Sequence, residues 1–325
     1  MIKRFVLAAS AAASLLFAAA PSPATAQPYP SRPVHVVVPF APGGPVDVLA
    51  RVLGQDFGEA WSQPFVVDNR AGAAGNIGVD YLAKAAPDGY TIGVVPAGNI
   101  AVNPSLFPNL PYKASDLQPV AMLATVENVL VVGADSPAKS LKDLLAMAAA
   151  RPDSVSFASP GAGSQAHLAG ELMALEGKVR MIHVPYKGTG PALNDVIGGQ
   201  VTMMFGQMSS VLPLIRGGKL RAVGVASLKR SATLPDVPTV AEQGMPRFEA
   251  VSWYALMVPA ATPKAVVDRL AAESSTMLAK PAIREKFAGL GLEPGGGTPQ
   301  ALAATIGTET ARWADVIQKK NIRAE

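Results

Sequence analysis

The chain has 325 residues and no cysteine, with 49% hydrophobic residues, 16% charged residues and a formal net charge of +4. This composition excludes a disordered protein, a disulfide-stabilised scaffold and a cysteine-ligated metal centre. The charge is too small for a protein that binds DNA by counterion release, so we expect no nucleic acid among its partners. The length suffices for two domains with buried cores.

The first residues have the pattern of a secretory signal peptide. Lys3 and Arg4 precede an apolar run over residues 5–20, and an A-x-A pattern ends at Ala26. The run is shorter than the ~20 residues that a membrane-spanning helix needs. The pattern therefore predicts that residues 1–26 are cleaved after Ala26 and, for a bacterial source, that the protein lies in the periplasm.

The remaining chain alternates strands with helices. Residues 34–40 form an apolar, β-branched run that predicts a buried strand, and helical spacing follows over residues 48–57. Pro45 suits the first helical position, Asp47 suits the first turn, and Arg51 can pair with Asp47 at i,i+4. The pattern predicts further strands at 65–68, 91–95, 129–133, 155–158, 181–185, 201–205, 220–226 and 248–259.

Helices are predicted between and after these strands, at residues 77–85, 141–150, 165–174, 192–197, 263–278, 281–290 and 299–319. A short helix is expected at 240–244 and a flexible turn at 295–297. Strands that alternate with helices of 10–15 residues indicate an α/β protein with mainly parallel sheets.

Four glycine turns lie between a strand end and a helix start, at residues 43–44, 72–75, 161–163 and 188–190. Ligands of open α/β sheets bind at the carboxyl ends of strands, where the first N–H groups of helices are unpaired and the helix dipole is positive. Taken singly, each glycine is better explained by a tight turn. Four turns at matching positions favour a cleft that holds an anion from both sides.

Catalytic motifs are weak. The G-x-G-x-x-A pattern at 161–166 lacks an acidic partner for a ribose, and no phosphate loop, HExxH or GxSxG motif occurs. His35 and His183 fall in predicted buried strands. His167 follows Ser164 by three residues, which fits a helix N-cap better than a nucleophile–base pair. We therefore expect no catalytic residue, no metal, no cofactor and no enzyme.

Five motifs resemble the Bug family, the periplasmic solute-binding receptors of tripartite tricarboxylate transporters. They are PFAPGGPVDVLAR at 39–51, DNRAGAAGNIG at 68–78, KAAPDGYT at 84–91, HVPYKG at 183–188 and LPDVPTVAE at 234–242. The resemblance implies a type II periplasmic-binding-protein fold, with two α/β domains and a ligand cleft between them. Residues 27–126 and 253–325 would form the first domain, and residues 127–252 the second.

The resemblance also implies that the loop at 40–47 closes over a small carboxylate, which backbone N–H groups and ordered waters hold. The ligand-binding residues predicted in this way follow the strand ends of both halves: Phe40, Gly43, Gly44, Val46, Asp47, Gly75, Asn76, Ala97, Gly161, Gly163, Ser164, His167, Tyr186, Gly188, Thr189 and Gly206. A bulky residue at Gly44 is expected to block the ligand or to require a strained φ.

Two of these positions depart from the family pattern. Val46 stands where threonine is usual, and Gly206 where aspartate is frequent, so we expect a less polar pocket that is roomier at 206. The segment 96–99 is also unusual. These changes favour an acid without an amino group, either an aliphatic dicarboxylate or an aromatic carboxylate. Asp47 could serve an ammonium, but its place favours helix capping, and an amino-acid receptor is the alternative.

The expected partners are a small organic anion and the membrane subunits of a tripartite tricarboxylate transporter, with the protein itself a monomer. A sensor kinase that reads the closed protein is the alternative partner.

Overall fold

The computed structural model describes residues 29–186 and 188–323, and the chain from Arg32 onward forms one compact unit. The predicted signal peptide and its cleavage site after Ala26 lie outside the described residues.

Six strands form the first sheet, in the order β11–β4–β10–β3–β1–β2. Their bounds are β1 Val34–Val38, β2 Phe65–Asn69, β3 Thr91–Pro96, β4 Leu117–Val126, β10 Ser252–Pro259 and β11 Glu293–Gly296. Strand β1 pairs in parallel with β2 and β3, whereas β10 is antiparallel to β3 and β4. The carboxyl ends of β1, β2 and β3 therefore share one edge.

Helices cover this sheet. They are α2 Pro45–Trp61, α3 Asn76–Ala83, α4 Asn103–Leu106, α9 Lys264–Ala279, α10 Pro281–Gly289 and α11 Pro299–Lys320, with short helical turns η2 Ala73–Gly75, η3 Gly98–Val102 and η4 Ala114–Asp116. Helix α2 begins at Pro45 and buries Leu49, Leu53 and Phe57, which recur every fourth residue on one face. The start of this helix confirms the role predicted for Pro45.

Five strands form the second sheet, in the order β7–β6–β8–β5–β9. They are β5 Asn128–Gly133, β6 Ser156–Ser159, β7 Ile182–Pro185, β8 Met203–Gln207 and β9 Leu220–Val225, with helices α5 Leu141–Ala150, α6 Gln165–Glu176, α7 Thr189–Ile197 and α8 Met208–Arg216. Strand β6 pairs in parallel with β7 and β8. Their carboxyl ends also share one edge.

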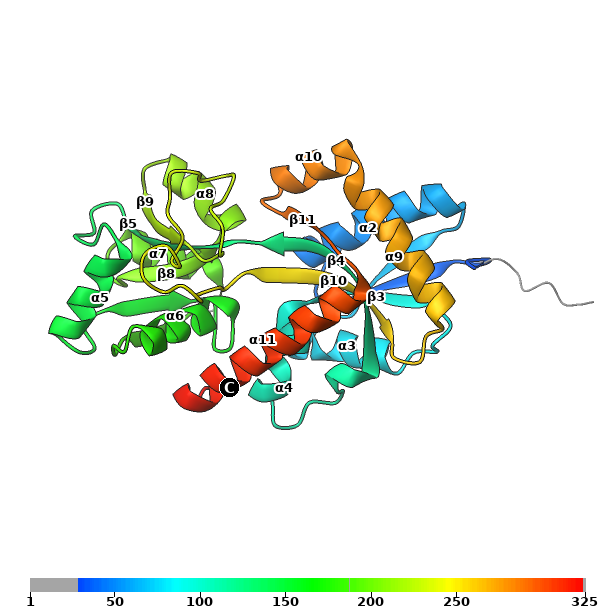
Figure 1. The fold of residues 1–325 in the computed structure, drawn as a ribbon, viewed down its shortest axis with the longest axis horizontal. Coiled ribbons are helices and arrows are strands. Elements are labelled where there is room, and N and C mark those ends of the chain that lie inside the picture. The colour runs from blue at the N-terminus through cyan, green and yellow to red at the C-terminus, as the bar shows by residue number, and fades with distance from the viewer. Residues whose placement is uncertain (1–28, 187, 324–325) are drawn as a thin grey trace, which may run out of the picture. The chain divides into compact units, whose positions relative to one another are not determined.

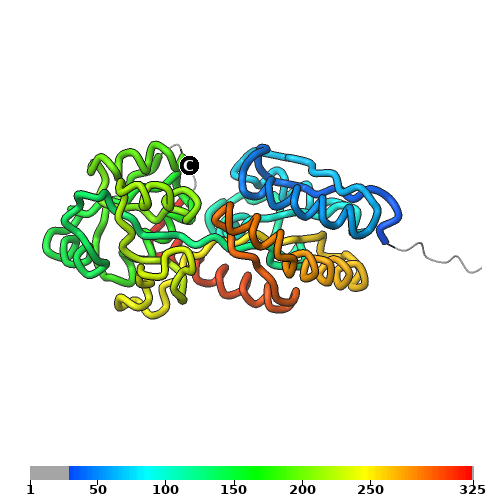
Figure 2. Tube along the Cα trace, turned by 90° about the horizontal axis from the view of Figure 1, so that it is seen from above, coloured from blue at the N-terminus to red at the C-terminus, as the bar shows by residue number. Residues whose placement is uncertain are grey.

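The chain passes from the first sheet to the second at a single residue, Glu127, which separates β4 from β5. The return segment leads into β10. It is fixed by hydrogen bonds from Asn128 Nδ2 to Ala250 O (2.6 Å) and from Ala250 N to Ala226 O (2.8 Å). Figures 1 and 2 show β4 and β10 running between the elements of the two sheets.

Several sequence predictions about the elements were wrong. Both sheets are mixed rather than mainly parallel, because β10 and β11 in the first sheet and β5 in the second run antiparallel to the strands that they pair with. Residues 240–244 form turns. Of the flexible turn expected at 295–297, residues 295 and 296 belong to strand β11, which pairs with β4. His35 is exposed rather than buried. No helix of the described residues is long and apolar enough to span a bilayer.

Candidate functional site

Helices begin directly after the parallel strands of both sheets. Helices α2 and α3 follow β1 and β2, and α6, α7 and α8 follow β6, β7 and β8. The first N–H groups of a helix are unpaired and lie at the positive end of its dipole. Each sheet therefore presents several anion-attracting helix starts along one edge, where α/β proteins bind ligands.

The β1–α2 loop is fastened by Asp47. Its carboxylate accepts hydrogen bonds from Gly43 N (2.9 Å), from Arg51 Nε and Nη2 (2.9 and 3.0 Å) and from Asn69 Nδ2 (3.0 Å). These contacts, that with Arg51 above all, lower the pKa of Asp47 to about 2. The Asp47–Arg51 ion pair predicted from the spacing is confirmed. Both carboxylate oxygens already accept two hydrogen bonds each, which leaves no acceptor for a ligand ammonium.

The same loop corrects the expectation for Gly44. The amide of Gly43 is bonded to Asp47, and it is Gly43 that has a positive φ of +91°. Gly44 has φ −81°, and a side chain there would meet nothing within 4 Å. A residue larger than glycine at 44 is thus unstrained. The first intrahelical bond joins Val48 N to Gly44 O, so the N–H groups of Val46 and Asp47 precede the helical ladder.

A buried amide cluster positions the loops after β2 and β3. Asn76 Oδ1 accepts from Asn103 Nδ2 (2.6 Å) and from Asn99 Nδ2 (3.3 Å). Tyr112 Oη donates to Asn99 O at 2.7 Å and lies 3.0 Å from Asn76 Oδ1, and burial raises the pKa of Tyr112 to about 12. The side-chain oxygen of the predicted residue Asn76 is therefore an acceptor within this cluster.

Phe40, Gly75 and Asn99 lie together beside this cluster. A side chain at Gly75 would crowd the Phe40 ring and Asn99 Nδ2, both about 3 Å from a Cβ placed there. Ala97, also predicted, is buried at the start of the segment after β3. The structure thus brings the predicted residues Phe40, Gly75 and Asn76 to one place.

The β6–α6 turn is held by its own side chains. Ser164 caps α6 by accepting from His167 N (3.3 Å), as predicted, and its hydroxyl donates to Gly161 O (2.7 Å). Gly163 N donates to His167 Nδ1 (2.9 Å), and Gly161 N donates to Ser159 Oγ (3.2 Å). The amides of Gly161 and Gly163 are therefore occupied.

The unpaired N–H groups at this turn belong to the two residues that follow Ser164. The first bond of the helix joins Leu168 N to Ser164 O, which places the N–H groups of Gln165 and Ala166 before the ladder. Neither residue was predicted from the sequence. The signal that could have found them is the N-cap serine itself, because the two residues after an N-cap have unpaired amides.

His167 and His183 form a stacked pair under this turn. Their ring centroids are 3.7 Å apart at 7°, and His183 Nε2 lies 2.7 Å from Ser159 Oγ. Burial lowers the pKa of each ring to about 4, and for His183 the neighbouring imidazole adds to the effect. Both rings are neutral at neutral pH, so they support the turn without adding charge.

The loops after β7 and β8 complete the predicted set. Tyr186 donates its hydroxyl to Asp195 Oδ2 (2.5 Å) and its amide to Ser159 O (2.9 Å), and the Asp195 contact raises the pKa of Tyr186 to about 12. Gly188 caps α7 and Thr189 is its first residue.

Gly206 is buried, and a side chain there would overlap Val211 Cγ1. The expectation of a roomier pocket at 206 is wrong, because Val211 fills that direction.

The two groups of loops come into contact where Leu106, on α4 after β3, packs against Gly163. Asn103, Tyr112 and Leu106 were not predicted from the sequence as supporting residues, and Asn99 was noted only as part of the unusual segment 96–99. Asn99 and Asn103 are four residues apart, a helical spacing that would place them on one face.

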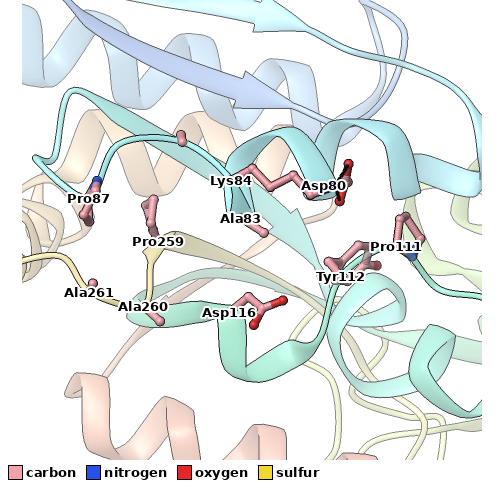
Figure 3. Close-up of a pocket in the computed structure, with 11 residues that line it drawn as sticks. Asp80, Ala83, Lys84, Pro87, Pro111, Tyr112, Asp116, Pro259, Ala260 and Ala261 are labelled. Carbon is pink, nitrogen blue, oxygen red and sulfur yellow. Dashed lines mark hydrogen bonds and ion pairs between the residues drawn. The ribbon is translucent and has the colours of Figure 1, made fainter.

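A cavity of about 350 Å³ lies at the opposite edge of the first sheet, beside the start of β3 and the end of β10. Figure 3 shows Asp80, Lys84, Tyr112 and Asp116 around it. Asp80 is paired with Lys84, and Asp116 accepts from Lys113 N. None of the predicted ligand-binding residues lines this cavity.

The sequence and fold match a known receptor family. Residues 49–322 match the family described as "Tripartite tricarboxylate transporter family receptor". The chain belongs to this family. Its members are periplasmic solute-binding receptors and not enzymes, and the resemblance to the Bug family and the two-sheet α/β fold are thereby confirmed.

Three relatives illustrate the similarity. Protein BugT of Bordetella pertussis is 43% identical over 300 residues, 92% of this chain and 92% of the relative. The structure of R. palustris Rpa4515 with adipate is 35% identical, covers 91% of this chain and all of its own, and has a TM-score of 0.77. MatC of Rhodopseudomonas palustris with bound malate is 34% identical, covers 89% of this chain and all of its own, and has a TM-score of 0.73.

Proposed function

We propose that this receptor binds a small aliphatic dicarboxylate between the loops of its two sheets and delivers it to the membrane subunits of a tripartite tricarboxylate transporter. The observation that carries the proposal is the set of helix-start amides, at Val46 and Asp47 on α2 and at Gln165 and Ala166 on α6, that precede their helical ladders. Amide donors at helix starts suit carboxylate oxygens. Donors on both sheets suit an acid with a carboxylate at each end.

The electrostatics of the loops support an acid without an amino group. A buried ammonium needs a carboxylate or several acceptors. Asp47 is the carboxylate of the predicted set, and all of its hydrogen-bonding capacity faces Arg51, Asn69 and Gly43. The relatives solved with adipate and with malate support a dicarboxylate. We therefore place aliphatic dicarboxylates ahead of aromatic carboxylates and amino acids.

We further propose that the two sheets belong to two domains that close on the ligand. Residues 27–126 with 253–325 would form one domain and residues 127–252 the other, with hinges near Glu127 and within 248–257. Two hinge segments permit a rigid-body closure. Small-angle scattering should show a smaller radius of gyration when a ligand shown to bind is added, and an unchanged radius would contradict the closure. The same measurement tests the proposed monomer.

Calorimetry tests the ligand class. We expect micromolar binding of adipate, succinate or malate, and no heat from aspartate, glutamate or benzoate. Micromolar binding of the amino acids without a response to the dicarboxylates would overturn the assignment, and binding of benzoate alone would favour the aromatic alternative. Uptake of the bound acid by membranes that contain the transporter subunits distinguishes delivery from presentation to a sensor kinase, which would leave uptake unchanged when the receptor is removed.

Gly44→Val tests the location of the site. The backbone at 44 accepts a side chain without strain, so the fold should be kept while the new side chain obstructs the start of α2. We expect binding to weaken more than tenfold, or about 1.4 kcal/mol. Gly307→Val, on α11, is the matched control because a side chain there also meets open space. Equal affinity in both variants would show that the β1–α2 loop does not contact the ligand.

A further inference from the structure

We propose that Glu171 and Lys320 are positioning residues, which hold His167 and, through it, the β6–α6 turn in the form that binds the ligand. The proposal rests on the function proposed above. It concerns two charged residues away from the predicted ligand contacts. Glu171 is the seventh residue of α6, about 9 Å along the helix axis from Gln165 at its start.

The hydrogen bond at the turn fixes where the proton of His167 lies. Gly163 N donates to His167 Nδ1 at 2.9 Å, so Nδ1 must carry a lone pair rather than a proton. The ring is neutral at neutral pH, because burial lowers its pKa to about 4. The single ring proton is therefore on Nε2. This tautomer is the one that keeps the Gly163 amide, and with it the shape of the turn, in place.

The proton on Nε2 faces a carboxylate. Glu171 Oε1 lies 3.8 Å from His167 Nε2, which is too long for a hydrogen bond but close enough for the charge to favour a proton on that nitrogen. The side chains of His167 and Glu171 are 8% and 15% exposed, so water screens this attraction only partly. The other groups that face the ring are His183, stacked on it and neutral, and Phe157.

Lys320 fixes the second oxygen of the same carboxylate. Its Nζ lies 3.0 Å from Glu171 Oε2, and its side chain is 24% exposed. Neighbouring Lys319 is 55% exposed and pairs instead with Asp315 on its own helix, at 2.8 Å. Lys319 thus forms an ion pair within α11, whereas the adjacent Lys320 forms one between α11 and α6.

Helix α11 connects this carboxylate to the first sheet. It packs against β4, η3 and α4 as well as against α6, and Figure 2 shows its C-terminal end reaching the elements of the second sheet. Lys320 therefore joins a helix of the first sheet to the residue that orients His167. A change in how α11 packs on α6 would reach the ligand turn through Glu171 and His167.

The test compares Glu171→Gln and Lys320→Gln with Lys319→Gln. Calorimetry with adipate measures binding, and amide exchange of Gly163 with the ¹⁵N shifts of the His167 ring measures the turn without ligand. We expect Glu171→Gln to weaken adipate binding at least fivefold and to speed Gly163 exchange at least tenfold. Lys320→Gln should act in the same direction, and Lys319→Gln should change neither quantity by more than twofold.

Three results would overturn the proposal: unchanged Gly163 exchange in Glu171→Gln, a His167 ring protonated on Nδ1 in the unmodified protein, or equal effects of the Lys319 and Lys320 changes. If Glu171→Gln does not fold, Lys320→Gln decides alone. If the unmodified protein does not bind adipate, the proposed ligand class is at fault, and the exchange and tautomer measurements still decide the roles of Glu171 and Lys320.

Discussion

The imidazole rings of His167 and His183 stack 3.7 Å apart, within 7° of parallel, directly beneath the β6–α6 turn. Two neutral rings pack well in this geometry, whereas two imidazolium ions would repel each other. Protonation of His167 would also displace the Gly163 amide from Nδ1. The protonation state of this histidine pair therefore affects the geometry of the β6–α6 turn.

This pair predicts how stability changes with pH. The pKa of each ring is about 4 in the folded protein and 6.5 in the unfolded chain, so the unfolded chain binds more protons between these values. The free energy of unfolding should be highest above pH 6.5 and fall toward pH 4, by up to about 1.4 kcal/mol per pH unit for each proton. Urea unfolding at several pH values measures this.

The control separates the histidines from the carboxylates that also titrate in acid. His167→Gln combined with His183→Gln should remove most of the slope between pH 6.5 and 5. His35→Gln, at an exposed position on β1, should leave the slope as it is. A double variant with the unmodified slope would show that other groups govern the acid sensitivity.

Gly163→Ala should destabilise the protein by about 2 kcal/mol or more. Gly163 has φ +72°, and a methyl group there would overlap Leu106 Cδ2. The cost should shrink when Leu106→Ala is present, because the smaller side chain leaves room. Gly44→Ala should stay within about 0.5 kcal/mol of the unmodified protein. Chemical denaturation gives all four values, and strictly additive changes would contradict the contact.

Tyr112→Phe should lower the free energy of unfolding by about 1–2 kcal/mol. The change removes the hydroxyl that donates to Asn99 O and lies 3.0 Å from Asn76 Oδ1, both of them buried. Tyr81→Phe is the control, since Tyr81 is 40% exposed and stacks on Arg70 through its ring. If both variants unfold at the same urea concentration, the contacts of the Tyr112 hydroxyl add nothing measurable to the free energy of unfolding.

Gly206→Ala should cost about 1–3 kcal/mol, because the new methyl group would overlap Val211. A second change, Val211→Ala, should recover part of that loss. Gly190→Ala, where a side chain would meet nothing within 4 Å, should not destabilise. Full stability of Gly206→Ala would mean that Val211 readily moves, and would restore the expectation of a roomier pocket at 206.

Local sequence signals predicted the helix starts well. Pro45, Asp47 and Arg51 defined the beginning of α2, and Ser164 defined that of α6, because caps and i,i+4 pairs involve residues a few positions apart. The positions of the strand ends followed from apolar, β-branched runs. These two kinds of signal were enough to locate the edges at which the candidate site lies.

Contacts between distant segments could not be read in the same way. Strand β4 contains Gln118, Pro119 and Thr125, which interrupt an apolar run, and it forms because β10 and β11 pair with it. At the site, the sequence assigned ligand contacts to the Gly43 and Gly163 amides. Both are engaged by side chains one helical turn ahead, Asp47 and His167, so the available donors lie further along each helix.

The order of the first sheet has a consequence for the way the chain folds. Strand β10 lies between β3 and β4, although all five strands of the second sheet separate it from them in sequence. While the chain is being made, β3 and β4 therefore lack the strand that joins them until residue 259 has emerged. The five strands of the second sheet are complete well before that point. We expect the second sheet to form early and the first sheet to close late, since long-range pairing is slow.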